Sequence, residues 1–317
     1  MKCGNHRLRE PLSSILAALS LGVCLPINAQ PSPTFRTSVS EVHVDVEVLD
    51  RNGAPVRGLS KEDFRVFDEG HEEATTGFEA GEQALDIVLL FDVSGSMRPN
   101  VEKVVKSADL ALAQLREGDR VAVMNFTSHI KEISPFSRNL DEVGRSVQSI
   151  LQQRFFGNTR IRRALFETAA YMINVPAQRR RRAIVIVTDN IAVGGPNQTT
   201  VVRNLWEADA VVCGIIVPEH RPRRSFGAPL PVSAGALFGD SVGPIAEKTG
   251  GASISLIDAE SDFPRVVLRL RNRYSLYYAP PPAIAGSTRS VQVRLSPSAE
   301  RTHASAQISA RKGYVVP

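Results

Sequence analysis

The chain has 317 residues, of which 43% are hydrophobic, and a formal net charge of +5. This length allows one large domain or two modest ones with a sizeable core. The composition is ordinary for a soluble globular protein, and so mild a positive charge gives no reason to expect a nucleic-acid partner.

The first 29 residues have the pattern of a secretory signal peptide. A basic start over residues 2–9 is followed by an apolar stretch over 12–25 and by the small residue Ala29. The apolar stretch is short for a bilayer-spanning helix, so we expect residues 1–29 to be removed and the chain to be periplasmic or secreted. An amphipathic anchor or a retained membrane segment is the alternative.

The cysteines indicate that the mature chain is stabilised by its apolar core rather than by disulfides. Cys3 and Cys24 leave with the signal peptide, and Val23 before Cys24 argues against a lipoprotein site. Cys213 remains, inside an apolar run, where a single thiol forms no internal disulfide and packs as a small apolar residue. No segment after the signal peptide is long and apolar enough to cross a membrane.

A β segment is expected over residues 30–83. Residues 42–48 alternate strictly between valine and polar residues, which predicts a strand with one buried face. Asn52-Gly53 indicates a turn, and Ser60 with Asp63 resembles a capping box for one helical turn. A second strand is predicted at residues 64–67.

From residue 84 to 279 apolar runs alternate with segments of helical period, which predicts an α/β domain with a mostly parallel central sheet and helices on both faces. Its strands are expected at 87–91, 120–126, 183–187, 210–217, 252–256 and 273–278. Its helices are expected at 101–115, 140–151, 161–173, 199–208, 242–249 and 262–271.

Two further segments complete the chain. Residues 218–241 are rich in proline, glycine and arginine, and we expect a surface insertion there. Residues 280–317 form a C-terminal β segment, since alternating apolar residues return at 291–295. The two β segments form either one β-sandwich-like module around the α/β domain or two separate extensions.

Polar side chains follow two buried strands of the predicted sheet. Asp92, Ser94 and Ser96 come directly after one strand, and Asp189 ends another. Thr159 lies in the polar loop before the helix at 161–173. Ligands of parallel α/β sheets bind outside the carboxyl ends of the strands, so these residues converge if the two strands are neighbours.

These five residues offer only oxygen ligands. Two carboxylates and three hydroxyls, without thiol or imidazole, suit Mg²⁺, Mn²⁺ or Ca²⁺ rather than Zn²⁺. Two carboxylates balance the charge of a divalent cation, which then has room for one more anionic oxygen. A partner protein that presents an acidic side chain would supply it.

The same residues resemble the metal-ion-dependent adhesion site of von Willebrand factor type A domains. The sequence Asp92-Val93-Ser94-Gly95-Ser96, with Thr159 and Asp189, matches that motif. The resemblance implies that Ser94, Ser96 and Thr159 are hydroxyl ligands of Mg²⁺ and that Asp92 and Asp189 bind it directly or through water. The wider chain resembles exported VWFA-related proteins of acidobacteria through residues 58–64 and 311–314.

One position departs from the motif. The family usually has glycine after the last aspartate, and this chain has Asn190. Asparagine tolerates unusual backbone angles, so the turn can survive, and its amide could narrow the site or add a ligand. The departure bears on the choice of metal more than on metal binding itself.

Three other interpretations compete with an adhesion site. In the first, Asp92 to Ser96 merely cap the following helix and bind no metal. In the second, the metal site is closed and serves to stabilise a scaffold protein. A serine hydrolase would place Ser94 at a strand–turn–helix junction, but the Gly-x-Ser-x-Gly pattern is absent and the histidines are scattered. We therefore expect a non-enzymatic protein.

The run Arg179–Arg182 is expected to be a solvated loop, or else a patch for a membrane or an acidic partner.

Overall fold

The computed structural model describes residues 41–81, 83–176, 180–218, 242–258 and 260–317. The expected signal peptide and most of the expected insertion at 218–241 lie outside the described residues. No helix in the described part of the chain is both long and apolar enough to cross a membrane.

A six-stranded sheet forms the centre of the α/β part, in the order β10-β9-β8-β5-β6-β7. The first five of these strands are parallel, and β7 at the edge runs antiparallel to β6. The predicted parallel sheet is confirmed, but β7 was missed because its residues are half-exposed and do not alternate cleanly. The strands are β5 (Leu85–Asp92), β6 (Arg120–Phe126), β7 (Ile130–Ser137), β8 (Arg181–Thr188), β9 (Ala210–Ile216) and β10 (Ser253–Ser255).

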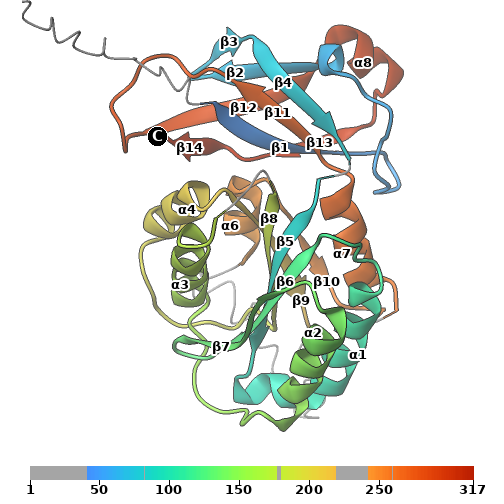
Figure 1. Ribbon diagram of the computed structural model, residues 1–317, viewed down its shortest axis with the longest axis vertical. Coiled ribbons are helices and arrows are strands. Elements are labelled where there is room, and N and C mark those ends of the chain that lie inside the picture. The colour runs from blue at the N-terminus through green and yellow to red at the C-terminus, as the bar shows by residue number, and fades with distance from the viewer. Residues whose placement is uncertain (1–40, 82, 177–179, 219–241, 259) are drawn as a thin grey trace, which may run out of the picture. The chain divides into compact units, whose positions relative to one another are not determined.

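Helices cover both faces of this sheet (Figure 1). Alternate residues of β5 point to opposite faces, so Leu89 packs in one apolar cluster and Leu90 in the other. The first face is covered by α1 (Val101–Leu112), α2 (Leu140–Gln148) and α7 (Asp262–Arg271). The second is covered by α3 (Ile161–Ile173), α4 (Gln198–Glu207) and α6 (Val242–Lys248). Two 3₁₀ helices, η2 (Gly95–Asn100) and η3 (Ser149–Gln152), lie beside α1 and α2.

The flanking strands form two antiparallel sheets, ordered β13-β1-β11-β4 and β14-β12-β2-β3, that share one apolar core. Each sheet combines strands from before and after the α/β part, so one β-sandwich-like module forms rather than two extensions. The elements are β1 (Val42–Leu49), η1 (Lys61–Asp63), β2 (Phe64–Asp68), β3 (His71–Glu73), β4 (Thr75–Ala80), β11 (Tyr274–Tyr278), β12 (Thr288–Leu295), α8 (Pro297–Thr302), β13 (Gln307–Ala310) and β14 (Gly313–Val315). The capping box of Ser60 and Asp63 is present at η1.

The strand expected at 273–278 was assigned to the α/β sheet, and that assignment was wrong. The strand exists as β11, but it pairs with β1 and β4 in the sandwich. Four of its five residues are buried, as in a central strand of a parallel sheet, so its own composition does not reveal its partners.

The prediction of a solvated loop at the arginine run was also wrong for the described residues. Arg181 and Arg182 begin β8 and are buried. Arg181 donates from Nε to Asp45 at 3.0 Å and from Nη1 to the Leu270 carbonyl at 3.1 Å. Arg180 pairs with buried Asp86, so these guanidinium groups satisfy buried acceptors instead of facing water.

Candidate metal-binding site

The site is built where β5 and β8 end next to each other. These strands are parallel neighbours, with Phe91 opposite Val187 in the register. Asp92 therefore lies beside Thr188 at the carboxyl edge of the sheet, with Asp189 one residue further along. The condition for convergence, that the two strands are neighbours, is met.

Asp92 is held by donors from three different segments and is only 2% exposed. Its Oδ1 accepts from the Ser94 amide at 2.8 Å and from Thr159 Oγ1 at 3.4 Å. Its Oδ2 accepts from Thr188 Oγ1 at 2.6 Å. The carboxylate is thus fixed in one orientation at the centre of the site.

The electrostatics of Asp92 favour a nearby cation. Burial raises the pKa of Asp92 to about 6, and the neighbouring charge of Asp189 adds to the rise, while the hydrogen bonds from Thr188 and Ser94 lower it. A metal ion beside the two carboxylates would remove this repulsion and stabilise the ionised form.

Asp189 holds an unused acceptor. Its Oδ1 accepts from the Ile191 amide at 3.1 Å, but its Oδ2 is buried without a hydrogen-bond partner among the described residues. An unsatisfied buried carboxylate oxygen is costly, and a cation is one of the groups that satisfies it.

The three hydroxyls surround the carboxylates at different depths. Ser94 is buried and its Oγ lies 3.2 Å from Ser96 Oγ, whereas Ser96 is exposed in η2. Buried Thr159 is positioned by its loop, because its carbonyl accepts from the Val193 amide at 2.9 Å. The structure therefore brings Asp92, Ser94, Ser96 and Thr159 into one hydrogen-bonded group, with Asp189 beside it.

Asn190 keeps the turn after β8. Its φ of 63° lies in the left-handed region that asparagine tolerates, as expected for a residue in the place of glycine. Its side-chain Oδ1 accepts from the Val242 amide at 2.9 Å, at the start of α6. The amide oxygen is thus engaged with the start of a helix, which holds the side chain in place beside the site.

The sequence analysis missed Thr188. Its hydroxyl donates to Asp92 and accepts from the Asn190 amide at 3.0 Å, so it supports both the carboxylate and the turn. The signal was its position as the polar last residue of an apolar strand, directly before Asp189.

The donor set fits a hard divalent cation through oxygen atoms alone. Among the described residues no group of three or more His, Cys, Asp or Glu side chains is placed to hold a metal. No described histidine contacts Ser94: His43 pairs with Asp209 and His129 with Glu167. Neither of these two histidines is hydrogen-bonded to Ser94.

Many solved structures are similar to this chain, including the following three. An aerotolerance-related membrane protein from Bacteroides fragilis, with multiple mutations to serine, is 18% identical over 59% of this chain and 98% of its own, with a TM-score of 0.46. BatB from Bacteroides thetaiotaomicron is 15% identical over 59% and 97%, with a TM-score of 0.45. A von Willebrand factor type A protein from Catenulispora acidiphila is 11% identical over 89% and 75%, with a TM-score of 0.46.

No curated protein matches the sequence. The family comparison matches residues 87–192, which include all five predicted site residues, to the von Willebrand factor type A domain. The central parallel sheet with helices on both faces is the fold that this family predicts. Residues 87–192 of this chain are therefore similar to the von Willebrand factor type A domain.

Proposed function

We propose that this chain is an extracytoplasmic module that binds a partner protein through a divalent cation, with Mg²⁺ as the first choice. Ser94, Ser96 and Thr159 supply hydroxyl oxygens, and Asp92 and Asp189 supply negative charge. The coarser part of this function is common to the family, whose domains are protein-interaction modules. The metal, the partner carboxylate and the export are parts of the proposal.

The observation that carries the proposal is the buried Asp189 Oδ2, which has no donor among the described residues. It lies beside Asp92, whose carboxylate is also buried and already bears three hydrogen bonds. Because both Asp92 oxygens are engaged, we expect Asp92 to act on the metal mainly through bound water. Two carboxylates then neutralise the cation without exhausting its coordination shell.

The exposed hydroxyl of Ser96 marks the side from which a partner reaches the metal. A carboxylate oxygen is the ligand that best completes a hard cation with several neutral ligands. An Asp or Glu side chain of the partner would therefore bind here, and removal of the metal would release the partner.

Two features of the chain support a place outside the cytoplasm. The pattern of residues 1–29 predicts a signal peptide, although those residues lie outside the described ones. Cys213, left after removal of that segment, is buried, and burial raises the pKa of its thiol. A protonated buried thiol is poorly reactive, so it suits an oxidising compartment.

A thermal melt of the chain from residue 30, which holds every described residue, tests the metal. After EDTA treatment, Mg²⁺, Mn²⁺ or Ca²⁺ is titrated back, and the same series is run on Asp92→Ala, Asp189→Asn and the exposed control Asp141→Asn. A cation at a hundredfold excess over its dissociation constant adds about 2.7 kcal/mol of stability. We expect this gain in the unchanged chain and the control and its loss in the two site variants.

A closed metal site in a scaffold protein is the second candidate, favoured by the three protein hydrogen bonds that already hold Asp92. Such a site would bind the metal but leave no coordination position open to a carboxylate of a partner. Acetate tests this difference, because an open site bound to Mg²⁺ accepts a free carboxylate, whereas a closed one does not. Metal stabilisation that acetate and acidic peptides leave unchanged would favour the scaffold.

A further inference from the structure

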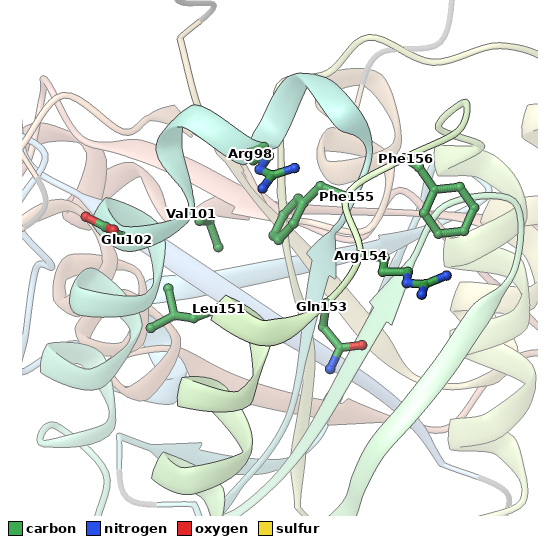
Figure 2. A pocket seen from close by; sticks show the side chains of 8 residues that line it. All are labelled: Arg98, Val101, Glu102, Leu151, Gln153, Arg154, Phe155 and Phe156. Atoms are coloured by element: carbon green, nitrogen blue, oxygen red, sulfur yellow. The ribbon is translucent and has the colours of Figure 1, made fainter.

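A second surface feature lies next to the candidate metal site. A groove of about 680 Å³ is lined by residues of η2, α1, η3 and the loop before Thr159. Figure 2 shows Leu151 and Val101 toward one end of the groove, Phe156 at the other, and Arg98 and Phe155 between them. The full set of lining residues is Arg98, Val101, Glu102, Leu151, Gln153, Arg154, Phe155 and Phe156.

The groove and the metal site have two segments of the chain in common, η2 and the loop before Thr159. The Phe156 amide donates to the Val93 carbonyl at 3.1 Å, which joins the groove loop to the segment between Asp92 and Ser94. A β-carbon built on Gly95 would lie 4.0 Å from the Phe155 carbonyl oxygen. Arg98 belongs to the same short helix, η2, as Ser96. A segment bound in the groove would therefore run past the metal.

Large apolar side chains are exposed around this edge of the sheet. Phe156 is 63% exposed and Leu151 is 41% exposed, and both line the groove. Ile257, on the loop after β10, is 77% exposed, and its carbonyl accepts from Lys103 of α1 at 2.8 Å. Exposed apolar groups gathered beside a polar site are typical of protein-binding surfaces.

The charge of the groove favours an acidic partner. Arg98 and Arg154 are exposed, and neither forms an ion pair within the described part of the chain. Glu102 is the acidic residue among the lining side chains, so the lining carries two guanidinium groups and one carboxylate. Arginine and aromatic residues together are the side chains most enriched at the centres of protein interfaces.

We propose that this groove binds an extended, acidic segment of the partner protein that carries an aromatic or large aliphatic residue close to the acidic residue that reaches the metal. The apolar side chain packs against Leu151, Phe155 and Phe156, and a further acidic residue pairs with Arg98 or Arg154. This inference rests on the proposed function, since it names the partner of the same site.

A displayed library of random peptides of about 12 residues is the probe. It is selected on the Mg²⁺-loaded chain from residue 30, and the enriched peptides are synthesised and their affinities measured. The variants are Phe156→Ala and the pair Arg98→Glu with Arg154→Glu. The controls are Ile284→Ala, an exposed apolar residue of the loop before β12, and Arg301→Glu on α8.

We expect the enriched peptides to share an Asp or Glu at a fixed short spacing from a Phe, Trp, Tyr, Leu or Ile. Phe156→Ala and the double arginine variant should each weaken their binding about tenfold or more, and the controls should not. Replacing the apolar residue of the peptide by alanine should weaken binding to the unchanged chain and have little further effect on Phe156→Ala.

This experiment distinguishes failure of the groove inference from failure of the proposed metal-dependent function. If Mg²⁺ stabilises the chain and EDTA releases the peptides, but the groove variants bind as tightly as the unchanged chain, the groove inference is overturned and the proposed function stands. The groove inference is also overturned if the enriched peptides are acidic without a shared apolar residue, or if no peptide is enriched. If neither Mg²⁺ nor EDTA changes stability or binding, both proposals fall.

Discussion

Thr188 Oγ1 donates a hydrogen bond of 2.6 Å to Asp92 Oδ2, and the same oxygen accepts from the Asn190 amide at 3.0 Å. One buried hydroxyl thus links the ends of two neighbouring strands and the left-handed turn that follows. The candidate metal site depends on this link, because it orients the carboxylate at its centre.

Thr188→Val should destabilise the metal-free chain by about 2 kcal/mol, because it leaves a buried carboxylate oxygen and a backbone amide without partners. Urea unfolding in EDTA measures this loss. Thr168→Val is the matched control, since Thr168 is equally buried but its hydroxyl has no hydrogen-bond partner among the described residues. Equal losses in the two variants would show that the Thr188 bond adds nothing to stability.

Asp92→Asn should stabilise the metal-free chain at pH 7. The pKa of Asp92 is raised from 3.8 to about 6, so its contribution to stability is fully present below pH 4 and is lost as the pH rises through about 6. The neutral amide avoids this loss, and we expect a gain of up to about 3 kcal/mol at pH 7 that disappears near pH 4.

Unfolding in EDTA across this pH range gives the comparison. Mg²⁺ at a thousandfold excess over its dissociation constant adds about 4.1 kcal/mol to the unchanged chain and should reverse the order of the two proteins at pH 7. Asp141→Asn serves again as the control, with no pH-dependent difference expected. A gain for Asp92→Asn that is the same at pH 4 and pH 7 would contradict a buried ionised Asp92.

Arg181→Met should destabilise the chain by about 3–5 kcal/mol, because it leaves the buried carboxylate of Asp45 without its arginine partner and with His43 as its remaining counterion. Burial alone would raise the pKa of Asp45, but the charges of Arg181 and His43 outweigh burial and hold it well below its usual value. The Nε–Oδ1 distance of 3.0 Å indicates a direct charged hydrogen bond.

Adding Asp45→Asn to Arg181→Met should recover part of this loss, since no buried charge then remains unpaired. Chemical denaturation of both single variants and the double variant completes the cycle. Arg301→Met on the exposed surface of α8 should change stability by less than about 0.5 kcal/mol. Additive losses in the double variant would rule out the coupling.

Tyr314→Phe should make the sandwich less sensitive to base. Tyr314 and Tyr278 both donate to Asp68 Oδ2, at 2.7 Å and 2.9 Å. Burial and the hydrogen bond to Asp68 raise the pKa of Tyr314 from 10.0 to about 12. The unfolded chain therefore ionises first, and the stability from Tyr314 is lost as the pH rises from about 10 through 12.

Melting temperatures between pH 9 and pH 11.5 test the direction of this pH dependence of stability. The unchanged chain should lose stability over the window, and Tyr314→Phe should lose less, starting from a lower value at pH 9. Tyr171→Phe is a comparison in the α/β part, where burial also raises the pKa of a tyrosine to about 12. A steeper loss in Tyr314→Phe than in the unchanged chain would contradict the predicted role.

The elements could be predicted where their signal is local. The helices at 161–173 and 262–271 were predicted with the bounds that α3 and α7 have, because a buried stripe of helical period is written in the segment itself. The meeting of Asp92 and Asp189 was conditional on β5 and β8 being neighbours, and the strand pairing meets that condition. Whether these residues hold a metal stays a prediction.

Other features depend on distant partners. β11 has the composition of a core strand of either sheet, and only pairing with β1 and β4 assigned it to the sandwich. Arg181 looks like a surface residue in its own segment, and it is buried because Asp45, 136 positions away, supplies a carboxylate. The groove is likewise made by η2 and η3, which are separate in the chain.

The sequence by itself determined the strand and helix alternation and the order of the polar residues at the strand ends, because periodicity and turn chemistry are properties of neighbouring residues. Only the tertiary structure decided which strands pair, which charges are buried and what supports Asp92. Those outcomes depend on contacts between segments far apart in the chain. The free energy of such contacts cannot be deduced from any single segment.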